Sequence, residues 1–461
     1  MQNQVFKLSS AALLLVLAGC ASVDVTPNYD GVQDQIAAAT GADDLYVPGQ
    51  EGAAHERVTE LLEGGLTAQE AVQVCLLNNR ELQVRLFEIG LSQADAVQAG
   101  MLSNPSLEAL IRFPVNGGST GTEFGLLQNL IELWRRPALK GLAEGEVDRV
   151  TLDVAFRAVE LAAQAKSEFY TAQASEAALA VAEENLGTTQ EFLQLTRERL
   201  EAGAATQVDL NAARSEYLEQ QVFVRSTRFD ALEAKRRLAG VLGVTTPARE
   251  LRLVGPPLAL PEWSVDLEQA LEVAAEHRLD LRSAVKAVEL AWDAIPLERR
   301  PLLRSLSGGL DVELEGGDLA LGPAVELELP IFDQNQAQIA KAELRYAREL
   351  RQLAGLEAQV AQQVRGAYEA LAMAKETARL YRAELLPLRE SGLELARESF
   401  AAGKTGFLSV LEAQEQLLEA RSDYVDWLEF VAMSIPALEA ACGRPILALQ
   451  GPAETAGAHD D

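Results

Sequence analysis

The sequence predicts a mainly helical protein with a small β part, built twice from one unit: a helix, a β-hairpin, a very long helix and a returning helix. Three observations predict this fold class. The chain repeats itself at an offset of about 200 residues, two short stretches alternate apolar and polar residues, and each stretch precedes a long helical pattern.

The repeat is clearest between residues 197–224 and 397–424. Arg197-Glu198 returns as Arg397-Glu398, and Ala202-Gly203 returns as Ala402-Gly403. Each copy reads as a helix that ends at a glycine, a short turn and a second helix that runs back, which is the pattern of an αα-hairpin. The chain is therefore a tandem duplication.

The N-terminus has the features of a secretory signal. Lys7 precedes an apolar run over residues 11–17, followed by Leu17-Ala18-Gly19-Cys20. The run is too short to span a bilayer permanently. Leu-Ala-Gly-Cys resembles a bacterial lipobox, which implies cleavage before Cys20, lipid on its thiol and, with Ala21 and Ser22 next, an outer-membrane address. An ordinary signal peptide is the alternative.

These patterns divide the chain into six segments. After the signal peptide (1–19) comes a lipid-anchored arm (20–60), expected to be mostly irregular with one short helix near residues 32–39. Repeat 1 (61–243) has hairpin strands at about 105–131 and a tip at about 203–208. A proline-rich linker (244–263) leads to repeat 2 (264–441), with strands at about 305–330 and a tip at about 403–408. The tail (442–461) is expected to be disordered.

Two β-hairpins are predicted from residues that alternate in polarity. In the first, Leu107, Ile111 and Phe113 alternate with polar residues, and a turn follows at 116–118. The second hairpin has one aliphatic face and one acidic face. The acidic face carries Asp311, Glu313, Glu315, Glu326 and Glu328.

Helical patterns fill most of the remaining chain. A helix is expected over residues 66–102, with Thr67 and Glu70 forming a capping box, and it recurs near 264–297. The long helices are expected at about 136–202 and 335–402, and about 67 residues correspond to roughly 100 Å. Apolar heptads in them favour a coiled or bundled assembly, with the core of a globular helix pair as the alternative. Gly187 and Pro387 mark an equivalent weak point in the two copies.

Composition excludes several functions. A net charge of −29 disfavours nucleic acid and anionic lipid surfaces, and suits a cavity that tolerates cations. Cys75 and Cys442 are expected to be buried thiols, although one bridge between them is possible. His55, His277 and His459 lack metal-ligand or triad spacing, so no metal, cofactor or catalytic residue is predicted, and the protein is not expected to be an enzyme.

The hairpins suggest a membrane role once other chains are considered. Four strands of about 9 to 11 residues are long enough to cross a bilayer when tilted. They cannot close a barrel alone, and an open sheet edge is not stable in lipid, so three copies would be needed to give twelve strands. The alternative is a soluble, half-buried sheet with a solvated acidic face.

The duplicated arrangement resembles the TolC-type outer-membrane efflux factors over essentially the whole mature chain. The most specific match is the tip sequence at residues 199–209 and its copy at 399–409. The resemblance implies a homotrimer, a twelve-stranded barrel in outer-membrane lipid, and a coiled-coil helical tunnel through the periplasm. It also implies that the tips meet a periplasmic adaptor protein and an inner-membrane pump.

The resemblance also implies roles for particular residues. Members of this family place an acid six residues after the tip glycine, which fits Gly203 and Asp209, whereas Ser409 follows Gly403. The periplasmic aperture is therefore assigned to Asp209, Ser409 and Glu412, with Asp209 and Lys404 latching neighbouring tips. Residues expected to contact the adaptor are Arg197, Gly203, Ala204, Thr206, Gly403, Lys404 and Thr405. A helix-start role for Asp209 is the alternative.

The function expected from these observations is the passive outer-membrane duct of a tripartite efflux system. Two alternatives remain. One is a lipid-anchored periplasmic coiled-coil scaffold with a small soluble sheet. The other, within the family, is a duct for type I protein secretion. The segment 130–133, Leu-Ile-Glu-Leu, also resembles the heavy-metal branch of the family.

Overall fold

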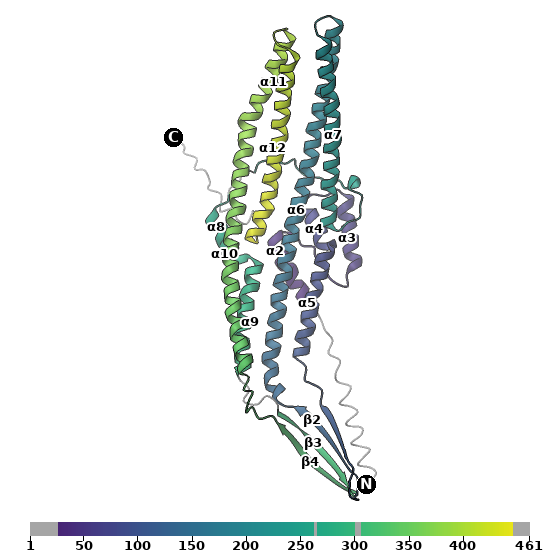
Figure 1. Cartoon of the computed structure of the whole chain (residues 1–461), viewed down its shortest axis with the longest axis vertical. Helices are drawn as coiled ribbons and strands as arrows, with labels where there is room; N and C mark the ends of the chain where they lie inside the picture. Colours follow the sequence, from purple (N-terminus) through teal and green to yellow (C-terminus); the bar gives the residue numbers. More distant parts are fainter. Residues whose placement is uncertain (1–25, 262–264, 300–305, 446–461) are drawn as a thin grey trace, which may run out of the picture. The chain divides into compact units, whose positions relative to one another are not determined.

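A computed structural model describes residues 26–261, 265–299 and 306–445. They form two compact units (Figure 1). The first unit contains residues 26–31, 87–153, 282–299 and 306–354, and the second contains residues 32–86, 154–261, 265–281 and 355–445. Each of the two long helices contributes residues to both units, so neither unit corresponds to a single copy of the duplication.

The first unit is built around one antiparallel sheet in the order β1-β2-β3-β4. Its strands are β1 (Ser106–Arg112), β2 (Gly121–Asn129), β3 (Leu306–Glu315) and β4 (Asp318–Leu327). Helices α5 (Arg80–Ala99) and α9 (Leu279–Arg299) lead into the two hairpins, and α6 (Ile131–Glu201) and α10 (Gln336–Leu380) follow them. The predicted hairpins are therefore present, and β2 joins β3 to make one sheet with β1 and β4 at its edges.

The second unit consists of helices. It contains α3 (Glu51–Glu63), α4 (Ala68–Asn78), α7 (Gln207–Leu242), the 3₁₀ turn η1 (Ala248–Glu250), α8 (Leu267–His277), the π-turn η2 (Tyr381–Leu385), α11 (Leu386–Ala401) and α12 (Phe407–Cys442), together with most of α2 (Thr26–Thr40). No described helix is long and apolar enough to cross a membrane.

The short helix expected near residues 32–39 is present within α2, where Val32 and Ile36 are buried. The rest of the described arm was expected to be mostly irregular, but residues 26–31 extend α2, with Tyr29 buried, and α3 forms at Glu51–Glu63. Glycine and proline were treated as helix breakers, but Pro27 is the second residue of α2, where its missing N–H costs little. Gly41 and Gly49 have positive φ and lie in the connection between the helices, where Gly41 directly follows the end of α2.

The helix expected over residues 66–102 is also different, because it divides at Asn79. Thr67 and Glu70 form the predicted capping box of α4. Asn79 is extended, and its Nδ2 donates to the Val241 carbonyl at 2.8 Å. Arg278 is extended at the matching place in the second copy, and its Nη1 donates to the Ala441 carbonyl at 3.2 Å. The bend is therefore duplicated, although the side chains that hold it differ.

The two copies differ at the predicted weak point. In the first copy α6 continues through Gly187 without interruption. In the second, the π-turn η2 precedes Pro387, and the N–H of Leu386 donates to the Tyr381 carbonyl. Proline has no N–H to continue the regular pattern, which explains why the wider turn occurs in this copy alone.

Candidate functional site: the two-faced sheet and the helical tips

The sheet has one acidic face and one apolar face. Residues directly opposite each other in neighbouring strands point to the same side, so the register assigns every side chain to a face. Asp311 is paired with Gly125 and Gly322, and Glu313 with Glu123 and Ala320. One face therefore carries seven carboxylates: Glu108, Glu123, Asp311, Glu313, Glu315, Asp318 and Glu326. Glu328, predicted on the same face, follows the last residue of β4.

Arg112 is the one cation on this face among the described residues. Its guanidinium bonds the Glu123 carboxylate at 2.5 Å and the Glu313 carboxylate at 3.3 Å. These pairs are largely exposed, so each contributes little to stability. The face keeps an excess of six negative charges per chain. The sequence prediction omitted Glu108, Glu123 and Asp318, which the alternation of both hairpins could have revealed.

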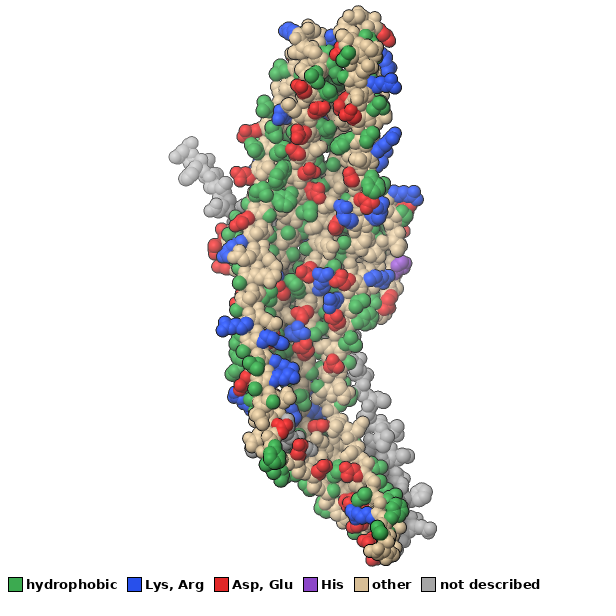
Figure 2. All heavy atoms as spheres, viewed as in Figure 1, with side chains coloured by type: hydrophobic (Ala, Val, Ile, Leu, Met, Phe, Trp, Pro, Cys, Tyr) green, Lys and Arg blue, Asp and Glu red, His purple; other side chains and the backbone are tan. Residues whose placement is uncertain are grey.

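The opposite face is apolar and uncovered. Its large side chains are between 41% and 74% exposed: Leu107, Ile111, Phe124, Leu126, Leu310, Leu314, Leu319, Leu321, Val325 and Leu327. Hydrophobic and acidic side chains both reach the surface over the sheet (Figure 2). A contiguous apolar surface on a single chain marks a contact with membrane or with another protein.

The two helical tips share one backbone turn. Gly203 and Gly403 each have a φ of 71°, which residues with a side chain rarely adopt. The N–H of Ala204 donates to the Arg199 carbonyl at 2.7 Å, and the N–H of Lys404 donates to the Ser399 carbonyl at 2.9 Å. Both helices thus end in the same glycine-containing cap, which fixes the direction in which the returning helix leaves.

The tips differ at the start of the returning helix. In the first, the Asp209 carboxylate accepts from the Thr206 N–H at 2.8 Å and from the Thr206 hydroxyl at 2.7 Å, and the Asp209 N–H donates back to that hydroxyl. The hydrogen bond from the Thr206 N–H is the main cause that lowers the pKa of Asp209 below its ordinary value, and the bond from the Thr206 hydroxyl lowers it further. In the second tip Gly406 replaces Thr206 and Ser409 replaces Asp209, and Gly406 has no side chain to cap the helix.

The structure thus gives Asp209 a local role. Both carboxylate hydrogen bonds described for it go to Thr206, and Ser409 donates its hydroxyl to the Gly406 carbonyl at 2.8 Å. Arg197, Lys404, Thr405 and Glu412 are exposed. Among the described residues, the side chains of Lys404 and Glu412 make no hydrogen bond or ion pair with Asp209. The Thr-x-x-Asp spacing of a capping box was visible in the sequence.

Sequence reasoning missed the contact between the two tips. Phe400 and Phe407 of the second tip pack with Val410, Leu393 and Ala213 in one apolar cluster, and Phe192 of α6 packs against it. The Arg199 guanidinium lies 4.3 Å from the Phe400 ring centre and donates to the Phe400 carbonyl at 3.1 Å. The Phe192 and Phe407 ring centres are 6.4 Å apart. Leu393 and Phe400 are seven residues apart, as in an apolar heptad pattern, and both are buried.

Polar contacts join the same helices farther from the tips. Arg421 of α12 bonds Glu184 of α6 at 2.9 Å and Glu390 of α11 at 3.2 Å. The buried Gln414 amide donates to Asn185 at 3.0 Å and Thr189 at 2.9 Å. The second hairpin is therefore attached to α6 by an apolar cluster with polar bonds beyond it.

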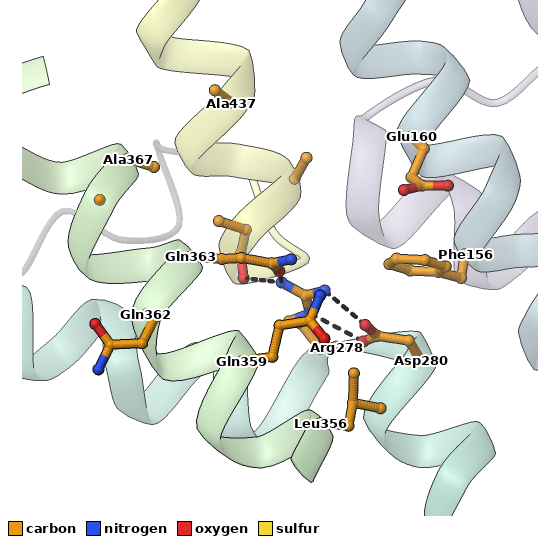
Figure 3. A pocket seen from close by; sticks show the side chains of 13 residues that line it. Phe156, Glu160, Arg278, Asp280, Leu356, Gln359, Gln362, Gln363, Ala367 and Ala437 are labelled. Atoms are coloured by element: carbon orange, nitrogen blue, oxygen red, sulfur yellow. Dashed lines mark hydrogen bonds and ion pairs between the residues drawn. The ribbon is translucent and has the colours of Figure 1, made fainter. Parts of the chain in front are cut away.

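A buried arginine organises the other end of the second unit. Arg278 is 4% exposed, bonds both Asp280 oxygens at 2.5 and 2.9 Å, and donates to Gln363 at 2.7 Å (Figure 3). Its guanidinium lies 5.6 Å from the Phe156 ring centre. A groove of about 670 Å³ beside it is lined by residues of α6, α10 and α12. All the arginine's contacts join helices of this chain, so its role is to position them.

Cysteine and histidine supply no reactive centre in the described residues. Cys75 and Cys442 are free and buried, as expected, and burial raises the pKa of each thiol to about 12. No group of three potential metal ligands occurs in the described ranges. Cys20 lies outside the described residues. The features that remain for function are the two-faced sheet and the tips.

A known protein family and several known proteins are similar to this chain. The profile of a family described as outer membrane efflux protein matches residues 270–444. More than a third of the chain therefore matches the outer membrane efflux protein family. Among its relatives, the antibiotic efflux pump outer membrane protein ArpC of Pseudomonas putida is 25% identical over 455 residues, 90% of each chain. The cobalt-zinc-cadmium resistance protein CzcC of Cupriavidus metallidurans is 26% identical over 258 residues, 54% of this chain and 60% of CzcC.

Solved structures of membrane proteins share the fold. A membrane protein from Pseudomonas aeruginosa aligns with a TM-score of 0.71 and 19% identity over 81% of this chain and 92% of that one. The outer-membrane channel OprN aligns with a TM-score of 0.69 and 17% identity over 88% of this chain and 95% of OprN. The mainly helical fold with two β-hairpins, which the sequence predicted, is therefore that of these membrane proteins.

Proposed function

We propose that this protein is the outer-membrane channel of a tripartite efflux pump, a passive duct that extends into the periplasm and works with pump partners. The match of residues 270–444 to the outer membrane efflux protein family and the likeness to ArpC support this function. The single observation that carries it is the sheet. One face carries large, uncovered apolar side chains, with Thr122 and Gln128 as its polar residues, while the other carries seven carboxylates. It is a transport protein and not an enzyme.

The sheet favours a homotrimer. Both of its edge strands are unpaired among the described residues, and an unpaired edge is not stable in lipid. A ring of three copies would pair each β4 with the β1 of the next copy and give twelve strands. The strands have 7, 9, 10 and 10 residues, which suits the membrane band of a tilted barrel, about 25 Å high.

The apolar face would then contact lipid, and the acidic face would line the water-filled lumen. A ring of carboxylates attracts cations and repels anions. We therefore expect the channel to be cation-selective. Replacing Asp311 with Asn and Glu313 with Gln should shift the reversal potential in a salt gradient towards zero, whereas Ser307→Ala on the same face should leave it unchanged. An unaltered potential in the double variant would remove these carboxylates from the lumen.

The tips are proposed to contact the adaptor, through the residues predicted from the sequence. Their exposure and their shared glycine turn support this role. We further propose that Glu412 and Ser409 line the periplasmic aperture. Glu412→Ala should change single-channel conductance and cation selectivity, whereas Glu394→Ala, an exposed acid on the preceding helix, should change neither. An unchanged conductance and selectivity in the Glu412 variant would exclude it from the constriction.

Lipid attachment at Cys20 is proposed from the lipobox sequence. Mass spectrometry of the mature protein purified from membranes would detect the acyl groups on Cys20. A Cys20→Ala variant should lack them and still enter the outer membrane through its barrel. An unmodified cysteine, or a first residue other than Cys20, would contradict the proposal.

One experiment distinguishes the channel from the scaffold alternative. The channel requires detergent for extraction, behaves as a trimer and conducts ions in a planar bilayer. The scaffold would become a water-soluble monomer without conductance once Cys20 is removed. The cargo is a separate question, since ArpC is named as an antibiotic efflux protein and CzcC as a metal-resistance protein. Growth of a deletion strain with drugs, with Zn²⁺ or Cd²⁺, and an assay of secreted protein would separate drug, metal and protein export.

A further inference from the structure

The groove beside Arg278 combines an aromatic ring, a carboxylate and several amides. Its volume is about 670 Å³, which lies in the range of small-molecule sites. Small residues of α10 and α12, among them Ala367, Ala437 and Ala441, form part of its lining and leave the space open. Every lining residue belongs to the second unit. We call this space the Phe156 groove.

The Phe156 ring lies between two charged groups. The Arg278 guanidinium is 5.6 Å from the ring centre, and both Asp280 oxygens accept hydrogen bonds from it. Figure 3 shows this ion pair on one side of the ring and the Glu160 carboxylate on the other. Phe156 and Glu160 are four residues apart on α6, so they are neighbours on one helix face. The ring therefore has a paired cation on one side and a carboxylate on the other.

This arrangement favours a second cation beside Glu160. The face of an aromatic ring attracts cations and not carboxylates, because it carries negative charge density. One Glu160 oxygen accepts from the Arg157 Nη1 at 3.0 Å, and no described residue donates to the other. Arg278 and Asp280 neutralise each other, so Glu160 gives the lining an excess of one negative charge. A cation between Glu160 and the ring would interact favourably with both.

The wall formed by α10 supplies hydrogen-bonding groups and apolar contact. It carries Leu356, Gln359, Gln362 and Gln363. The Gln363 carbonyl oxygen accepts from Arg278 at 2.7 Å, and no described residue accepts from its side-chain N–H groups. Amide side chains both donate and accept hydrogen bonds. An ammonium group joined to an apolar body matches these features, whereas an anion would meet the Glu160 carboxylate.

We propose that the Phe156 groove binds small organic cations with an apolar body, and that the positive charge lies between Glu160 and the Phe156 ring. The apolar body lies against Leu356 and Ala437, and polar substituents reach the glutamines of α10. A passive duct requires no ligand site, so this inference goes beyond the proposed channel function and does not depend on it. Salt should weaken the binding, because Glu160 is exposed and its attraction for a cation is screened.

Ethidium, a planar aromatic cation, is the probe for the purified protein in nanodiscs, with empty nanodiscs as the blank. Its fluorescence polarisation should rise with protein concentration, whereas that of fluorescein, an aromatic anion, should not. Glu160→Gln should weaken ethidium binding about fivefold, as expected for the loss of an exposed ion pair. Phe156→Leu should weaken it by a similar factor, because the cation–π contact is lost. Glu191→Gln, at an exposed position of α6 outside the groove, is the matched control and should leave binding unchanged.

Three results would overturn the site. They are equal affinity of the wild-type protein and Glu160→Gln for ethidium, an equal loss of affinity in Glu191→Gln, and binding of fluorescein as tight as that of ethidium. Conductance of the same preparation in a planar bilayer separates the site from the channel. A protein that conducts ions without binding ethidium overturns the groove and leaves the channel function intact. A protein that shows the expected binding pattern without conductance supports the groove and refutes the channel.

Discussion

Thr206→Ala should make the first tip behave like the second. Thr206 and Asp209 exchange three hydrogen bonds at the start of α7, whereas Gly406 and Ser409 leave the start of α12 without a side-chain cap. The tips are otherwise alike, with the same glycine φ and the same closing bonds. The difference in capping should therefore appear as a difference in local opening.

The magnitude follows from helix capping. Loss of a threonine N-cap costs about 1 kcal/mol, and that corresponds to about a fivefold change in the opening equilibrium. Hydrogen exchange of the amides at 207–211 should accelerate by about this factor in Thr206→Ala. Gly406→Thr combined with Ser409→Asp should slow exchange at 407–411 by a similar factor. The free energy of global unfolding should also fall by about 1 kcal/mol in Thr206→Ala, because the unfolded chain lacks the same bonds.

The assay is hydrogen exchange followed by mass spectrometry on the detergent-solubilised protein. A peptide from α8 serves as the internal control, because its N-cap, Asp266, is not altered. Equal exchange at the two tips of the wild-type protein would refute the reasoning. So would unchanged exchange in Thr206→Ala, since the bonds to Asp209 would then contribute nothing.

Two further predictions concern stability. Burial is the main cause that raises the pKa of Glu429 in α12. The charged carboxylate therefore lowers the free energy of unfolding. This loss of stability is complete at a pH above the pKa of Glu429 in the folded protein, and it disappears as the pH falls through that pKa. Glu429→Gln should therefore raise the unfolding midpoint at about pH 7.5. It should not do so at about pH 4, where Glu429 is mostly protonated even in the unfolded chain. An equal rise of the midpoint at both pH values would contradict this. Arg278→Ala should lower the free energy of unfolding by about 3 to 5 kcal/mol, because it leaves Asp280 without its buried partner. Arg157→Ala, which removes a more exposed pair with Glu81, should cost about 1 kcal/mol or less, and urea titration would compare the two.

The sequence predicted the duplicated architecture because the repeat and the two periodicities agree. Alternation fixed which residues of β3 share a face, and the register confirms this for Asp311 and Glu313. Neither periodicity shows which strand of the first hairpin pairs with which strand of the second. The pairing of β2 with β3, which brings Glu123 beside Glu313, required the structure.

The failures have local causes. At residues 26–63 several glycines and prolines suggested loops, but some lie at helix ends and Gly31 and Gly52 are tolerated inside helices. The break at Asn79 has no glycine or proline to announce it, and depends on a carbonyl at Val241, 162 residues away. Asp209 is a different case. The three-residue spacing from Thr206 was sufficient to predict the capping box that the structure has, and the latch between Asp209 and Lys404 stays a prediction.

The differences between the copies are as informative as the repeat. Gly203 and Gly403 keep the same φ, and Asn79 and Arg278 keep the same bond to the end of the returning helix, so the backbone of the duplication is retained. The side chains at the tips have diverged, because the capping box of Thr206 and Asp209 has no counterpart at Gly406 and Ser409. In both copies the glycine and its closing hydrogen bonds therefore set the turn, while the stability of the first turn of the returning helix differs between them.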